Sequence, residues 1–167
     1  AAEHLTPVTL EMGGKNPCVV DETANIPLAA RRIVWGKFIN CGQTCIAPDY
    51  VLVHKKVKNQ FVESCKKEIT RIYGDDPRQS PDYGRIINHP NFEVLKRSLA
   101  GEKILSGGNT DPDDLYIEPT LLDNPDKDNH VMKHEIFGPI LPVISYDTEQ
   151  EIHDCINSYE KPLAFYI

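Results

Sequence analysis

The sequence predicts an α/β fold in which helices flank a largely parallel, doubly wound sheet. Segments patterned like strands alternate with segments patterned like amphipathic helices along most of the 167 residues. This order is typical of a parallel sheet whose strands are joined by helices. Hydrophobic residues make up 40% of the chain and charged residues 26%, as in globular rather than disordered proteins. The length suffices for one domain with a sizeable core.

The first half of the chain shows the alternation clearly. We expect strands at 6–10, 18–20 and 50–54 and helices at 26–40 and 57–73. The turn at Gly13-Gly14 separates the first two strands, and the third is rich in β-branched and aromatic residues. Pro27 suits the first turn of its helix, and Gly74 is the expected end of the second helix.

The second half continues the alternation after a loop at 75–82 that is rich in Asp and Pro. We expect a helix at 92–99, extended segments at 103–106 and 116–122, a buried strand at 140–145, a helix from 148 to about 159 and a last strand at 163–167. Gly101 closes the first of these helices, and Thr148 is the expected N-cap of the second.

Composition and charge argue against several classes of function. The net charge is −7 and no basic run exceeds two residues, so we expect no nucleic-acid partner. No apolar stretch approaches the ~20 residues of a membrane span. The six histidines are dispersed and no CxxC pair occurs, so we expect no metal site. The five cysteines have no framework spacing, which favours free thiols in a reducing, cytoplasmic compartment.

Both ends of the sequence interrupt a pattern. An extended pattern begins almost at the first residue, and the apolar run 163–167 meets no turn residues. We therefore expect the chain to be part of a longer protein.

One cysteine and two glutamates stand in short motifs that contain glycine. Cys45 follows the first expected helix among small residues, where its sulfur could act as a nucleophile and nearby amides could stabilise an oxyanion. Glu11 precedes Gly13-Gly14 and could act as a general base. Glu135 precedes the rigid turn Phe137-Gly138-Pro139. From the residues alone, a buried structural cysteine, a surface glutamate and an ordinary turn stay open as alternatives.

Three motifs together resemble the aldehyde dehydrogenase superfamily in their order and spacing. They are Leu10-Glu11-Met12-Gly13-Gly14-Lys15, Gly42-Gln43-Thr44-Cys45 and Glu135-Ile136-Phe137-Gly138-Pro139. Flanking runs are most similar to the class 3 branch, which includes the fatty aldehyde dehydrogenases. These runs are Asn16-Pro17-Cys18, Cys45-Ile46-Ala47-Pro48-Asp49-Tyr50, Gly84-Arg85-Ile86-Ile87-Asn88 and Glu160-Lys161-Pro162-Leu163-Ala164. The resemblance implies that residues 1–167 form part of a catalytic domain, without the amino-terminal cofactor-binding domain and without the carboxy-terminal continuation.

The resemblance also implies an activity, the NAD(P)-dependent oxidation of aldehydes to carboxylic acids. Cys45 would attack the aldehyde carbon to give a thiohemiacetal, whose oxyanion is held partly by the Cys45 N–H. Hydride transfer to the nicotinamide would leave a thioester. Water activated by Glu11 would then release the acid.

The same resemblance implies a binding site for NAD or NADP. Glu135 would bind the nicotinamide ribose, and Phe137 would lie against that end of the cofactor. Met12 and Gly13 would border the nicotinamide. The whole protein would be a homodimer acting on a small-molecule aldehyde, and its attachment to the endoplasmic reticulum membrane is left open. The isolated chain would be inactive.

Two other functions remain open at this point. A non-catalytic relative that kept the fold as a scaffold would have no need of Cys45, Glu11 and Glu135 together. A CoA- or phosphate-dependent acylating member of the superfamily would also use the cysteine. A glutamate at position 11 points instead to water as the acceptor.

Overall fold

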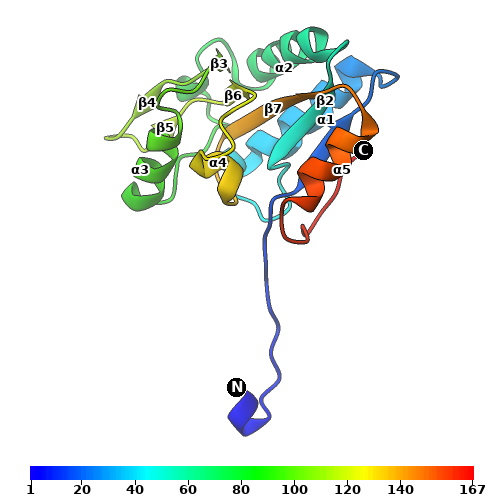
Figure 1. Cartoon of the computed structure of the whole chain (residues 1–167). Coiled ribbons are helices and arrows are strands. Elements are labelled where there is room, and N and C mark those ends of the chain that lie inside the picture. Colours follow the sequence, from blue (N-terminus) through cyan, green and yellow to red (C-terminus); the bar gives the residue numbers. More distant parts are fainter.

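The computed structural model describes residues 1–167 and contains an α/β sandwich built on a five-stranded sheet (Figure 1). The strand order is β1-β2-β7-β6-β3. The strands are β1 (Pro17–Val20), β2 (Tyr50–His54), β3 (Ile104–Ser106), β6 (Thr120–Asp123) and β7 (Ile140–Tyr146). The pairings β1–β2, β2–β7 and β6–β7 are parallel, and only the edge strand β3 is antiparallel to its neighbour. The predicted fold class is confirmed.

Five α-helices flank this sheet. They are α1 (Ile26–Phe38), α2 (Lys58–Tyr73), α3 (His89–Ser98), α4 (His130–Lys133) and α5 (Glu149–Asn157). Three single 3-10 turns and a two-stranded hairpin complete the structure: η1 (Ala2–His4), η2 (Ile39–Gly42), η3 (Pro77–Gln79), β4 (Thr110–Asp111) and β5 (Tyr116–Ile117). None of the helices combines the length and the apolar character that crossing a bilayer requires.

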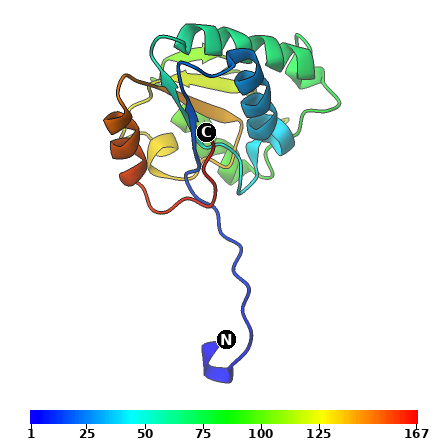
Figure 2. The same ribbon diagram turned by 90° about the vertical axis from the view of Figure 1, so that its right-hand side faces the viewer.

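Strand β2 is covered on both faces. Val51 and Val53 belong to the large apolar cluster that includes α1 and α2, whereas Tyr50 and Leu52 pack with Tyr146 and the apolar face of α5. Successive residues of a strand point to opposite faces of the sheet, so β2 is buried throughout. Figure 2 shows α1 and α5 on opposite sides of the sheet, which is the doubly wound arrangement.

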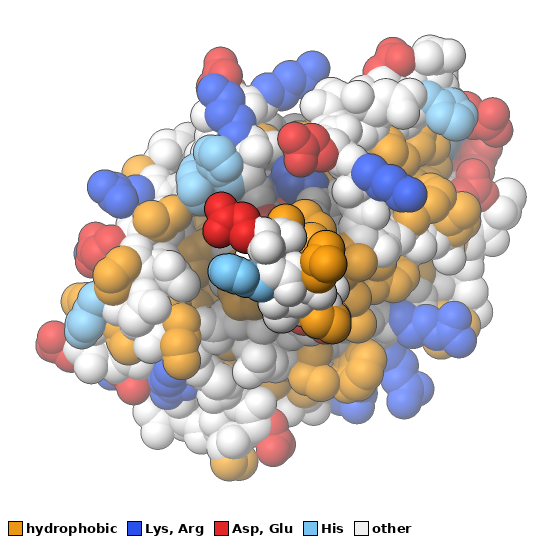
Figure 3. Space-filling model, turned by 90° about the horizontal axis from the view of Figure 1, so that it is seen from below, with side chains coloured by type: hydrophobic (Ala, Val, Ile, Leu, Met, Phe, Trp, Pro, Cys, Tyr) orange, Lys and Arg blue, Asp and Glu red, His pale blue; other side chains and the backbone are white.

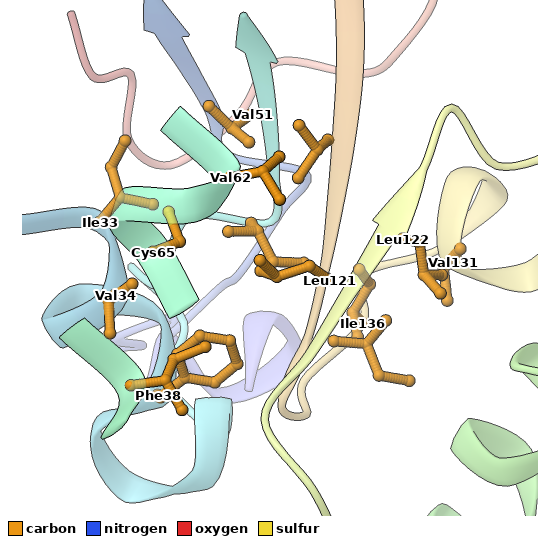
Figure 4. Packing of buried hydrophobic residues seen from close by; sticks show 14 of the residues in the cluster. Ile33, Val34, Phe38, Val51, Val62, Cys65, Leu121, Leu122, Val131 and Ile136 are labelled. Carbon is orange, nitrogen blue, oxygen red and sulfur yellow. The ribbon is translucent and has the colours of Figure 1, made fainter. Parts of the chain in front are cut away.

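Strand β6 shows the same alternation. Leu121 lies near Val62 of α2, whereas Leu122 lies beside Val131 of α4 (Figure 4). Both leucines are fully buried, and burial of such a side chain contributes about 1.5–3 kcal/mol relative to leaving it exposed. The core therefore continues on both sides of the sheet as far as β6.

Local sequence signals set most helix ends. The side chain of Asn25 caps α1, and Gly74, with φ +81°, follows the last residue of α2. Thr148 and Glu151 form a reciprocal capping box at the start of α5. The helix predicted at 92–99 begins earlier, at His89, because the side chain of Asn88 accepts a hydrogen bond from the N–H of Asn91 and caps it.

Three predicted extended segments are wrong in whole or in part. Residues 6–10 form no strand, because no neighbouring strand pairs with them and all are exposed. The segment 163–167 contributes a single bridge, between Tyr166 and Cys18. The segment 116–122 divides into β5 and β6, which belong to different sheets, because Pro119 has no N–H to continue one ladder. The short elements α4 and β4 were not predicted.

Residues 1–12, called the arm below, extend away from the body (Figures 1 and 2). All twelve are exposed. The arm leaves the body shortly before β1, so the face beneath it lies at the amino-terminal ends of the parallel strands. Figure 3 shows this face from below, with hydrophobic side chains gathered around the base of the arm.

Candidate active site

The three glycine-containing motifs meet at the amino-terminal edge of the sheet. The first motif precedes β1, the second precedes β2 and the third precedes β7. These three strands are neighbours and parallel, so their starting ends lie along one edge. Segments that are far apart in the sequence are thereby adjacent in space.

Glycines let the motifs approach one another closely. A Cβ atom on Gly42 would lie 2.2 Å from the carbonyl oxygen of Gly138, and one on Gly13 would lie 2.3 Å from both carboxylate oxygens of Glu135. Gly42 has no room for any other side chain because the clash is with backbone, whereas a side chain at position 13 would displace the Glu135 carboxylate. Gly42 also adopts φ +73°, which favours glycine. The second and third motifs are therefore in backbone contact, and Glu135 lies directly on the first motif.

Cys45 lies in a short loop between α1 and β2. The chain leaves α1 through Asn40 and Cys41, both in left-handed conformations, and then passes Gly42. Cys45 is half-buried and starts a turn in which the N–H of Ala47 donates to the carbonyl of Thr44 at 3.0 Å. The N–H of Cys45 donates no hydrogen bond to any group of the chain. The loop thus presents a reachable sulfur beside a free backbone donor.

The other cysteines are poor nucleophiles. Burial raises the pKa of Cys18 to about 12 and that of Cys41 to about 11, and it raises the pKa of Cys65 further. Burial also raises the pKa of Cys155. A thiol that resists ionisation reacts slowly. Of the five free cysteines, Cys45 is the one whose position suits covalent chemistry.

A buried ion pair joins the motifs. Lys15 and Asp49 pair with side chains only 6% and 4% exposed. Lys15 also donates to the carbonyls of Val131 at 2.7 Å and His134 at 3.1 Å, and Asp49 accepts a 2.9 Å hydrogen bond from the N–H of Ile136. One lysine and one aspartate thereby fix the starts of β1 and β2 against the segment that carries Glu135.

Glu135 is half-buried, and this burial raises the pKa of its carboxyl group, although the backbone amide of Gly14 opposes the shift. Phe137 lies two residues further on with φ +48°, a strained conformation for an aromatic residue, and the residue is 41% exposed. Met12 is exposed beside Gly13. The structure therefore brings together four predicted cofactor-site residues at the base of the arm.

Glu11 stands apart from these contacts. It lies in the exposed arm, where it makes no hydrogen bond or ion pair with the rest of the chain. The structure does not bring its carboxylate to Cys45, and its role as a base stays a prediction.

Sequence reasoning missed a fully buried lysine near this site. Lys37 occupies the last turn of α1 and is 0% exposed. Burial lowers its pKa to about 8, and the opposite charges of Asp49 and Glu135 offset part of that shift. Lys37 directly precedes the core residue Phe38 in the sequence, but a lysine is ordinarily interpreted as a surface residue. Only the fold shows that acidic groups lie nearby.

The aldehyde dehydrogenase family model matches residues 1–167, the whole chain. Among curated proteins, the chain is 51% identical to aldehyde dehydrogenase family 3 member A2 of Rattus norvegicus, covering 100% of the chain and 34% of that protein. It is 50% identical to 4,4'-diaponeurosporen-aldehyde dehydrogenase of Staphylococcus aureus, covering 37% of that protein. It is 49% identical to the dimeric NADP-preferring aldehyde dehydrogenase of Canis lupus familiaris, again covering 37%. The chain thus spans about a third of the length of these relatives.

Solved structures give the same result. The substrate-bound state of Staphylococcus aureus AldH matches with a TM-score of 0.94 and 49% identity over 99% of this chain and 36% of that one. Lactaldehyde dehydrogenase from Escherichia coli matches with a TM-score of 0.81 and 29% identity over 99% of this chain and 41% of that one.

The Lys15–Asp49 pair generates a stability prediction. Lys15→Met leaves Asp49 buried without its cation, so we expect the free energy of unfolding to fall by roughly 3–5 kcal/mol. Urea denaturation followed by circular dichroism measures this. The control is Lys56→Met, because Lys56 forms an exposed pair with Glu22 and such pairs contribute little. A similar loss in both variants would contradict the importance given to the buried pair.

Lys37 generates a prediction about pH. Its folded-state pKa of about 8 lies below that of an unfolded lysine, so between about pH 8 and the ordinary value near ~10.4 the unfolded state binds more protons. Stability should therefore rise with pH across this window and level off below about pH 8, where both states carry the proton. Lys37→Met removes the effect. Urea unfolding of both proteins over this range tests the prediction, and parallel pH profiles would refute it.

Proposed function

The chain belongs to the aldehyde dehydrogenase family, and from this premise we propose that the whole protein oxidises aldehydes to carboxylic acids with NAD or NADP through a covalent intermediate on Cys45. The observation that carries the proposal is the loop geometry of Cys45. Cys45 is half-buried, its N–H is unpaired, and it lies on a loop whose backbone contacts the Glu135 segment. A scaffold has no need of this arrangement.

The residues of the chain supply the nucleophile and an oxyanion donor. The Cys45 thiolate forms a carbon–sulfur bond to the aldehyde carbon, and the carbonyl oxygen becomes the anion of a thiohemiacetal. The Cys45 N–H, which has no partner in the chain, can donate a hydrogen bond to that oxygen. Oxidation of the carbon gives a thioester. Water deprotonated by Glu11 then attacks the thioester, releasing the acid and restoring the thiol.

The residues at the base of the arm fit a nicotinamide cofactor. The carboxylate of Glu135 offers acceptors for ribose hydroxyls, and Gly13 leaves it the room to lie there, since a Cβ would come within 2.3 Å of it. The exposed ring of Phe137 offers an apolar surface, with Met12 at the border. When bound, the cofactor takes up the hydrogen and electron pair that leave the aldehyde carbon.

The relatives suggest finer properties. The rat protein belongs to family 3, and the dog protein is named as dimeric and NADP-preferring. We extend to this protein an aldehyde substrate of the fatty class, a homodimer and a cytoplasmic location, with attachment to the endoplasmic reticulum membrane as an alternative placement. The identity to these relatives supports the aldehyde substrate, and the word dimeric in the dog protein's name supports the homodimer. The fatty class rests on the class 3 motifs of the sequence, and the location rests on its free cysteines.

The role of Cys45 predicts a loss of activity on substitution. In the whole protein, Cys45→Ala should lower aldehyde-dependent NAD(P)H formation by at least roughly 10³-fold, since no other group replaces the nucleophile. The control is Cys155→Ala, because Cys155 is also half-buried but belongs to α5 and packs against the cluster that contains Tyr50. Substantial turnover by Cys45→Ala would exclude the covalent mechanism.

The role of Glu11 predicts a change in kinetic phase. Glu11→Gln should form one equivalent of NAD(P)H in a burst. Its steady-state rate should then be lower by roughly 10²–10⁴-fold, because the thioester is no longer hydrolysed efficiently. Stopped-flow absorbance of the whole protein measures both phases, with Glu3→Gln in the same arm as the control. If the steady-state rate of Glu11→Gln were unchanged, Glu135 rather than Glu11 would be the general base. Rescue by CoA would favour the acylating alternative.

A further inference from the structure

The loop that carries Cys45 is held by its carbonyl oxygens. The side-chain amide of Asn16 donates to the carbonyl of Cys45 at 2.8 Å and to that of Ala47 at 3.0 Å. The hydroxyl of Tyr166 donates to the carbonyl between them, that of Ile46. Three successive carbonyls are therefore bound by two side chains from opposite ends of the sequence.

Asn16 has no freedom to turn. It is 1% exposed, and both hydrogens of its amide are used on the loop. Its side-chain oxygen accepts from the N–H of Ala164 at 2.8 Å, and its backbone carbonyl accepts from the N–H of Asp49 at 2.8 Å. A buried amide with all these bonds made is oriented strongly, because any rotation would leave a buried polar group unpaired.

These bonds fix the peptide planes on both sides of the Cys45 Cα. The preceding plane is held because the carbonyl of Thr44 accepts from Ala47, and the following plane is held because the carbonyl of Cys45 accepts from Asn16. Two fixed planes determine φ and ψ of the residue between them. They therefore determine the directions of the Cys45 N–H and of its Cα–Cβ bond.

We infer that Asn16, assisted by Tyr166, is a positioning residue for the nucleophile. It orients the Cys45 N–H toward the position where the oxyanion forms, while the sulfur faces the aldehyde carbon that it attacks. This inference rests on the proposed aldehyde oxidation. A hydrogen-bond donor stabilises an oxyanion well only when its orientation is fixed before the reaction, and losing one such donor lowers kcat by about 10²–10³-fold. Asn16 touches neither substrate nor cofactor and acts through the loop.

The test compares Asn16→Ala, Asn16→Asp and Asn124→Ala in the whole protein. Asn124 is the control because its side chain also bridges two segments, accepting from the Ser145 N–H at 2.7 Å, but at the opposite edge of the sheet. Steady-state kinetics with an aldehyde gives kcat and KM. The rate at which iodoacetamide alkylates Cys45 reports on the reactivity of the sulfur alone, because this displacement reaction forms no oxyanion. Thermal unfolding is followed for every variant.

We expect both Asn16 variants to lower kcat by roughly 10–100-fold, with KM and the alkylation rate within about threefold of the parent. A kcat within threefold of the parent overturns the inference. The inference is also overturned if the alkylation rate and the unfolding temperature fall together with kcat, because Asn16 is then merely structural.

Tyr166→Phe keeps the test decisive if the Asn16 variants do not fold, because it removes one hydroxyl from a half-buried residue. We expect kcat to fall about threefold to tenfold, with KM unchanged, the net effect of one lost hydrogen bond. No fall in kcat would overturn the inference. An inactive parent protein would instead overturn the proposed function, so the two failures are distinguishable.

Discussion

The site depends on the buried ion pair between Lys15 and Asp49. Removing two charges from water is costly, and their attraction offsets that cost only when the remaining donors and acceptors are satisfied. Here the lysine has two carbonyl acceptors and the aspartate has the N–H of Ile136. A shift of any one segment would leave a buried charge incompletely paired. The pair therefore specifies how the starts of β1, β2 and β7 fit together, whatever its net contribution to stability.

This constraint explains why the site lies at the amino-terminal edge of the sheet. Open α/β sheets usually bind ligands beyond the carboxyl ends of their strands. In this chain the carboxyl ends lead into ion pairs, such as the exposed pair Lys55–Asp147 and the largely buried pair Lys58–Asp123. The glycines that permit close approach precede the strands instead: Gly42 meets the backbone of Gly138, and Gly13 meets the side chain of Glu135. Chemistry therefore concentrates where the three glycine-containing segments converge.

The elements that sequence predicted well are those whose signals are local. Strand β2 and helix α2 carry patterns and end residues within their own bounds, and both occur within a residue of the prediction. The segment 6–10 has a strand-like pattern, yet a strand also needs a neighbour, which no local pattern reports. Cys45 and Glu135 were found through motifs. The contacts that hold them were missed, because they join residues 29 to 148 positions apart.

Chain geometry also limits where Glu11 can lie. Gly13 is fixed against the carboxylate of Glu135, and two residues span at most about 7 Å. Whatever direction the arm takes, the Cα of Glu11 stays within that distance of Gly13 and so remains beside the cofactor-side residues. Rotation about the backbone bonds between Glu11 and Gly13 changes the direction in which the glutamate lies and leaves it within this distance. The arm therefore tethers a carboxylate next to the site, and neighbouring surfaces decide whether it faces Cys45.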